Sequence, residues 1–109
     1  MPVWNATPIE QTPELSLARW TIREVQPRNT RHLVGYNLTE QEGRVSSHIT
    51  GYDAERHRVT TESGRVYELV GDPGYNDDAE YVWENWFLFL GTQAESWTDV
   101  THDYVLKSE

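Results

Sequence analysis

Histidines are the residues of this chain best suited to acid–base or metal chemistry. The four of them are His32, His48, His57 and His102. None belongs to an HxH or HExxH pattern, and a zinc site would need three or four ligands converging from separate elements. His48 is the best candidate because it lies within a predicted strand, opposite its apolar residues. An outward-facing or hydrogen-bonded histidine is nevertheless the commoner arrangement on a sheet, so we expect no metal.

Carboxylates gather near residue 80, where they are better explained by a helix start than by catalysis. Asp77, Asp78, Glu80 and Glu84 lack the DxDxDG spacing of a calcium loop. We expect Asp77 to be the helix N-cap, with Glu80 reaching back to it and Asp78 adding favourable negative charge. Acid–base work would need a buried carboxyl with a raised pKa, and the start of an exposed helix does not provide one. No GxSxG or Walker motif is present, and no cofactor is expected.

The charge is strongly asymmetric along the chain. The formal net charge is −9, yet residues 1–66 hold eight acids and eight arginines, whereas residues 67–109 hold ten acids and the single Lys107. The basic footprint expected of a duplex-DNA binder is missing, and an anionic membrane would repel the acidic half. The asymmetry is consistent with simple solubility or with an acidic face that meets a basic partner.

Composition indicates one soluble domain. The chain of 109 residues has no cysteine and no apolar run of membrane-spanning length, and its N-terminus lacks the pattern of a signal peptide. We therefore expect a cytoplasmic protein that does not enter the membrane. Three prolines among polar residues predict an extended N-terminal arm over residues 1–14, followed by a single α+β domain over residues 15–109.

Short runs of alternating or β-branched apolar residues predict five strands. They lie at about residues 15–25, 32–38, 44–52, 57–61 and 65–71. The apolar parity shifts between Leu17 and Trp20, which predicts a bulge or twist there. Gly64 lies between the last two runs and predicts a hairpin turn. The expected sheet is curved, mostly antiparallel and five-stranded, and a half-barrel is one form it could take.

A helix is predicted over residues 77–90, from apolar residues that recur at helical spacing. These residues are Ala79, Val82, Trp83, Trp86, Phe87 and Leu90. Gly91 stands where a left-handed cap belongs. Tyr81, Leu88 and Phe89 lie off the apolar face, so the helix is either clamped between layers or exposed to a partner. Residues 96–106 are predicted to form a further helix that covers Phe89, with a sixth strand as the alternative. The fold is thus expected to be the sheet packed against one C-terminal α-helix.

Three stretches, "GRVSSHITGYD", "TESGRVYELVGDPG" and "DAEYVWENW", together resemble a pattern found in small proteobacterial proteins of mobile or integrated elements. The resemblance covers about residues 43–86 and implies a genomic setting. It implies no activity and carries over no site residue.

Three functional hypotheses follow, although the sequence alone does not reveal the function. The first is a small, acidic, non-catalytic interaction or regulatory module that binds a basic partner protein through Asp77, Asp78, Tyr81, Glu84 and Phe89. Its natural role in a mobile element would be to regulate a nucleic-acid-handling system by presenting carboxylates in place of phosphates. A head-to-tail or dimeric self-association is also open, if the arginines lie opposite the acidic end.

The second hypothesis is a small-ligand or oligonucleotide site in the concavity of the sheet, lined by Tyr36, His48, Tyr52 and Tyr67. A stripe of Arg56, Arg58 and Arg65 along the hairpin would support it, although pairing of these arginines with neighbouring glutamates is the simpler expectation. The third hypothesis is an enzyme with His48 or His57 as its general base.

Overall fold

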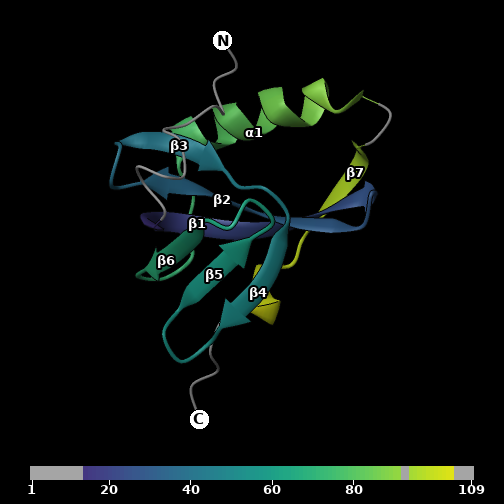
Figure 1. Cartoon of the computed structure of the whole chain (residues 1–109). Helices are drawn as coiled ribbons and strands as arrows, with labels where there is room; N and C mark the ends of the chain where they lie inside the picture. The colour runs from purple at the N-terminus through teal and green to yellow at the C-terminus, as the bar shows by residue number, and fades with distance from the viewer. Residues whose placement is uncertain (1–13, 92–93, 105–109) are drawn as a thin grey trace.

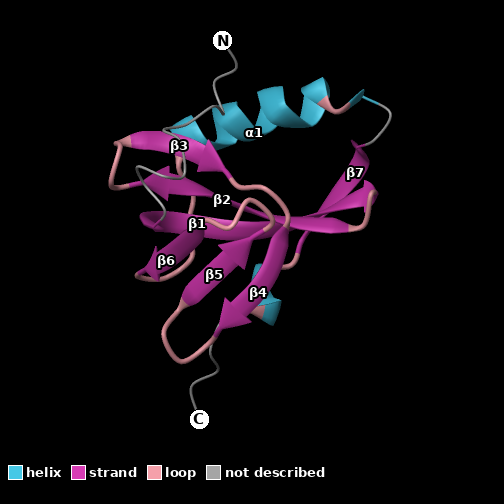
Figure 2. Cartoon of the chain, in the orientation of Figure 1, coloured by secondary structure: helices cyan, strands magenta, loops and turns pink. Residues whose placement is uncertain are grey.

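The computed structural model describes residues 14–91 and 94–104 and has an α+β fold with one helix (Figures 1 and 2). In chain order the elements of the described residues are β1 (Glu14–Pro27), β2 (Thr30–Asn37), β3 (Glu42–Val45), β4 (Ile49–Asp53), β5 (Arg58–Thr61), β6 (Val66–Val70), α1 (Asp77–Phe89), β7 (Ala94–Asp99) and the 3-10 helix η2 (Thr101–Asp103). The arm predicted over residues 1–14 falls outside this range except for Glu14, which begins β1. No helix of the described residues is long and apolar enough to cross a membrane.

The sheet is mostly antiparallel and follows the order β3-β2-β1-β6-β5-β4, with β7 paired to β1 off this path. The long strand β1 makes this possible, because one of its edges serves two partners. Glu14–Ala18 pair in parallel with β6, and residues 23–27 pair antiparallel with β7. The predicted irregularity in β1 is confirmed, since its register with β2 shifts between Ala18 and Thr21 and Arg19 has a φ of 48°. The predicted hairpin turn at Gly64 is also confirmed, with a φ of 90°.

The strand predicted over residues 44–52 is in fact two strands with different partners. β3 pairs with β2, whereas β4 pairs with β5. Ser46 marks the break, because its hydroxyl accepts a hydrogen bond from Leu33 N at 2.8 Å and donates one to Ser47 O at 2.7 Å. A serine hydroxyl that binds backbone groups competes with the regular ladder. The chain therefore leaves β2 and crosses to β5, and the sheet curves without closing.

Two hydrophobic clusters result from this curvature. The inner cluster is enclosed by the curved sheet and consists of Leu15, Leu17, Trp20, Ile22, Leu33, Ile49, Val59, Tyr67, Leu69 and Val100. The outer cluster lies between the sheet and α1 and consists of Val25, Val34, Val45, Ala79, Val82, Trp83 and Ala94. Trp86, Phe87 and Leu90 pack against the outer cluster but are only partly buried.

Helix α1 agrees with the predicted span, but its N-cap does not. Asn76 is the cap: its backbone is extended and its side chain accepts a hydrogen bond from Ala79 N at 2.9 Å. Asn serves as well as Asp in this position, so the cap lies one residue earlier than predicted. Glu80 does not reach back to the cap and instead forms an ion pair with Arg23. Gly91 has a φ of 59°, as expected of a glycine after a helix.

The prediction of a helix over residues 96–106 is wrong for residues 96–99, where its alternative of a strand is correct, and residues 105–106 lie outside the described residues. Residues 94–99 form β7, and a single 3-10 turn follows. β1 extends past the end of β6 and presents unpaired backbone at residues 23–27, which a six-residue strand satisfies. α1 is consequently not the C-terminal element but is followed by β7, which reaches the sheet beneath the end of the helix (Figure 1).

Candidate interaction surface

The outward side of α1 combines carboxylates with exposed apolar groups. Asp77, Tyr81, Glu84 and Leu88 recur at spacings of four, three and four residues, which places them in one line along the helix. Tyr81 is 61% exposed and Leu88 is 77% exposed, and both carboxylates face solvent. We call these four residues the outer stripe. The opposite side of the helix carries the buried Ala79, Val82 and Trp83.

The remaining predicted partner-binding residues flank this line. Asp78 is exposed in the first turn, and Phe89 is 71% exposed in the last turn. At about 100° per residue, both lie about 100° around the helix axis from the centre of the outer stripe. The structure therefore brings Asp77, Tyr81 and Glu84 together, with Asp78 and Phe89 at one border.

The other border of the stripe is an open groove between α1 and β7. It has a volume of about 320 Å³ and is lined by Glu80, Trp83, Glu84, Phe87, Leu88 and Trp97. Trp97 comes from β7 and is 41% exposed. Its ring meets that of Trp83 edge-on, with 5.5 Å between ring centroids, and does not shield Phe89 from solvent as the sequence suggested. Leu88 was recognised in the sequence as off the buried face, but Trp97 could be placed here only through the pairing of β7 with β1.

A buried arginine forms the floor beside this groove. Arg23 is 5% exposed and pairs with Glu80, while its guanidinium lies 5.0 Å from the ring centroid of Trp83 and 4.5 Å from that of Trp97. Its Nε and Nη1 atoms are buried without a hydrogen-bond partner among the described residues. The indole faces take the place of acceptors, since aromatic rings attract cations through their negative faces.

The surroundings of α1 are acidic. No lysine or arginine occurs between Arg65 and Lys107. Asp77 accepts a hydrogen bond from the exposed Tyr75 hydroxyl, which raises the pKa of that tyrosine. Arg19 from β1 lines a shallow hollow with Asp77 and Asp78, so the first turn of the helix is partly balanced by a cation. Glu84, at the middle of the helix, has no ion-pair partner among the described residues.

Of the four residues proposed for a ligand site on the concave face, Tyr67 is buried and the other three are half-buried. Tyr67 is 2% exposed and belongs to the inner cluster, and its hydroxyl accepts a hydrogen bond from Arg44 Nε at 2.9 Å. Tyr52 packs against the same cluster and its hydroxyl donates to Tyr104 O. Tyr36 is half-buried on β2. Around Tyr67, side chains of the inner cluster occupy the concave side of the curved sheet.

His48 lies in the segment between β3 and β4 and is half-buried. Its ring centroid is 6.4 Å from that of His32, whose ring stacks obliquely on Trp86 at 4.6 Å. His32 Nδ1 is 3.0 Å from Ser46 O and Nε2 is 2.8 Å from Thr30 Oγ1. Burial lowers the pKa of His32 to about 4, so this ring is neutral near pH 7.

His57 lies on a turn, edge-on to the buried Trp20. The described residues contain no cluster of three or more metal-ligating side chains.

The hairpin arginines do not form a basic stripe. Arg56 and Arg58 are exposed, whereas Arg65 is 4% exposed and thus points into the protein. Arg58 forms an ion pair with Glu14 at 2.9 Å and lies opposite Glu68 in the strand register. Arg58 therefore has the acidic neighbours that were expected. Because Arg65 is buried, the three arginines do not form the basic stripe that would have favoured binding of single-stranded nucleic acid.

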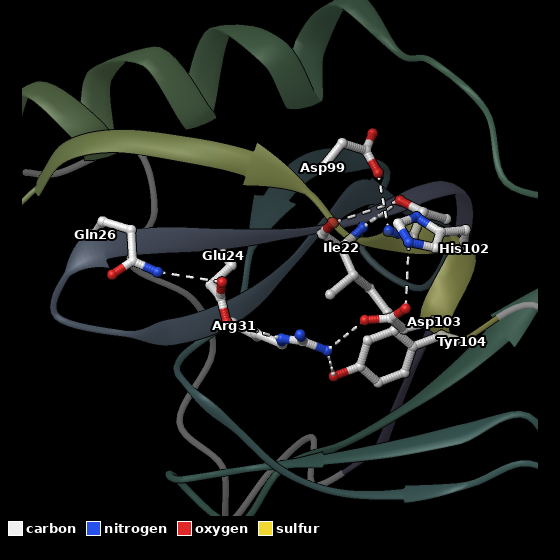
Figure 3. A network of polar contacts seen from close by, with 9 residues as sticks. Ile22, Glu24, Gln26, Arg31, Asp99, His102, Asp103 and Tyr104 are labelled. Carbon is white, nitrogen blue, oxygen red and sulfur yellow. Dashed lines mark hydrogen bonds and ion pairs between the residues drawn. The ribbon is translucent and has the colours of Figure 1, made fainter.

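A polar network around Arg31 is structural (Figure 3). Arg31 binds Glu24 at 3.2 Å, Asp103 at 3.1 Å and the Tyr104 hydroxyl at 3.3 Å. The hydrogen bond to Tyr104 and the proximity of Glu24 raise the pKa of Arg31. Nearby, Ile22 N donates to Thr101 Oγ1 at 2.9 Å. These contacts hold η2 and the end of the described chain against β1 and β2.

Comparisons with protein-family models, with curated proteins and with solved structures found no match to this chain.

Proposed function

We propose that the chain is a non-catalytic interaction module that binds a basic partner protein through the outer stripe of α1 and its borders. The observation that carries this proposal is the exposure of Tyr81 and Leu88 in one line with Asp77 and Glu84. Contiguous exposed apolar side chains rimmed by charge are typical of protein–protein interfaces. The carboxylates favour a partner with a positively charged surface, because they attract a basic surface and repel an acidic one.

The charge distribution of the chain supports the same proposal. The acids of residues 67–109 have only Lys107 as a cation in that part of the sequence, and Glu80 and Asp103 are drawn into ion pairs with Arg23 and Arg31. The acids of the helix surface thus remain available to a partner. A protein that normally binds nucleic acid is one class that would present the required positive surface, in keeping with a regulatory role in a mobile element.

The test compares two variants with the same change in net charge. In the first, Asp77→Asn, Asp78→Asn and Glu84→Gln remove three carboxylates from α1. In the second, Glu55→Gln, Glu62→Gln and Asp72→Asn remove three exposed carboxylates elsewhere. A partner captured from the source cells at low salt is purified, and its affinity for each protein is measured at two salt concentrations.

The helix variant is expected to bind about tenfold more weakly, since exposed ion pairs contribute about 0.2–1 kcal/mol each. The affinity of the wild-type protein should also fall as salt is raised. The second variant should bind as the wild type does. Equal binding by both variants and the wild type would refute the proposed function.

A further inference from the structure

The groove between α1 and β7 has the chemistry of a site for one arginine side chain. We propose that it receives a guanidinium from the basic partner, an inference that rests on the proposed function and specifies its central contact. The volume of about 320 Å³ is at the lower limit of the roughly 300–1,000 Å³ found for ligand pockets. The groove is therefore large enough to accommodate a single side chain.

The lining of the groove favours a cation with a flat, weakly hydrated head. Glu84 supplies a carboxylate that has no ion-pair partner among the described residues, and the exposed part of Trp97 supplies an aromatic surface. Phe87 and Leu88 add apolar surface for the aliphatic part of the side chain. A guanidinium stacks on aromatic rings and loses hydration more readily than an ammonium, so arginine fits this combination better than lysine.

The protein already binds one guanidinium in this way. Arg23 lies against the rings of Trp83 and Trp97 and pairs with Glu80. These two rings and this carboxylate also line the groove. The open side of the groove offers the same kinds of group, with Glu84 in place of Glu80 and Trp97 as the exposed ring, while Trp83 is buried. Because Arg23 neutralises Glu80, Glu84 gives the groove a net negative charge. A symmetric dimer that places α1 against α1 is disfavoured, since the surface of α1 is acidic and would repel its like.

The test uses hexa-arginine and hexa-lysine peptides, which carry the same number of charges and differ in the head group. At equal ionic strength, the wild-type protein should bind hexa-arginine about fivefold more tightly, as expected for one exposed cation–π contact. Trp97→Leu should bring the ratio of the two affinities close to one, and Trp97→Phe should retain most of the preference. Glu62→Gln lies outside the groove, on the exposed turn between β5 and β6, and should leave the ratio unchanged.

A second measurement does not depend on the folding of any variant. In the wild-type protein, the indole N–H resonance of Trp97 should shift more with hexa-arginine than with hexa-lysine, while that of the buried Trp20 should stay fixed. Salt-sensitive binding of both peptides with equal affinity would overturn the arginine site but leave the proposed function standing. A preference that persists in Trp97→Leu, or an unmoved Trp97 resonance, would also overturn it. If neither peptide binds at low salt, both proposals fail.

Discussion

The two hydrophobic clusters are covered in different ways, and this difference accounts for the unusual surface. The members of both clusters are buried, but the inner cluster is enclosed by strands of one curved sheet. The outer cluster depends on a single helix of 13 residues. A helix buries one side only, so the additional apolar residues of α1 remain in contact with water. The outer cluster therefore continues into partly buried and exposed apolar residues of α1, on which the proposed interface rests.

The largest expected loss of stability comes from comparing a tryptophan of the inner cluster with one that packs against the outer cluster. Trp20 is 1% exposed and its indole donates to Gly71 O at 3.2 Å, whereas Trp86 is only partly buried. Trp20→Ala should lower the free energy of unfolding by about 3–5 kcal/mol, and Trp86→Ala by about half as much. Urea denaturation of both variants measures this, and equal losses would contradict the difference in enclosure.

Lowering the pH should lower the free energy of unfolding through His32, whose ring contacts Trp86 of α1. Burial lowers the pKa of His32 in the folded protein to about 4, below the ordinary histidine pKa of 6.5, so the unfolded chain binds the proton more readily. Stability is therefore complete above about pH 6.5 and declines as the pH falls, by about 3 kcal/mol at pH 4. Urea denaturation between pH 7 and pH 4 measures the decline.

The control for this prediction is His32→Gln, which cannot titrate. This variant should lose less stability than the wild type over the same pH range, whatever its stability at pH 7. Parallel pH profiles for the two proteins would exclude His32 as the source of the decline.

The contact between α1 and β3 can be tested with a matched pair of glycines. A Cβ on Gly43 would lie 2.4 Å from Asp78 C and 2.5 Å from Ala79 N, so the helix backbone would have to move. Among the described residues, a Cβ on Gly51 would meet only Thr60 Cβ, at 3.9 Å. Gly43→Ala should cost about 1–3 kcal/mol, and Gly51→Ala should change stability by less than about 0.5 kcal/mol. Thermal unfolding of the two variants distinguishes them.

The smallest effect on stability is expected at the surface of α1. Leu88→Ser removes a side chain that is 77% exposed, so the free energy of unfolding should change by less than about 0.5 kcal/mol. The same variant should weaken the binding of a basic partner, because it removes apolar area beside Glu84. A clear loss of stability would show that Leu88 belongs to the core and would remove it from the proposed interface.

Several elements could be predicted because their signals are local. Apolar spacing over residues 79–90 specified the helix, and Gly64 specified the hairpin. The N-cap was misplaced by one residue because Asn76 and Asp77 are chemically similar caps. The strand over residues 44–52 was predicted as continuous because alternation does not reveal a change of partner at Ser46.

The candidate surface was predictable in part. Tyr81, Glu84 and Phe89 could be assigned to the exterior because they lie off the apolar face of the helix. The groove could not, since Trp97 reaches it only through the pairing of β7 with residues 23–27, far away in sequence. The burial of Tyr67 was missed for a related reason, because the inside of a curved sheet is defined by strands that come from different parts of the chain.

By itself the sequence determined the amphipathic helix, the turns and the acidic second half, since each depends on residue type and spacing over a few positions. Contacts between distant segments account for the rest: residues 94–99 form a strand, Tyr67 is buried inside the curved sheet, and Arg23, Trp83 and Trp97 meet beside Glu84. Segments that are distant in sequence compete to pair with the backbone groups of a strand edge and to cover an apolar face. A local pattern of residues does not show which segment forms the most stable contact.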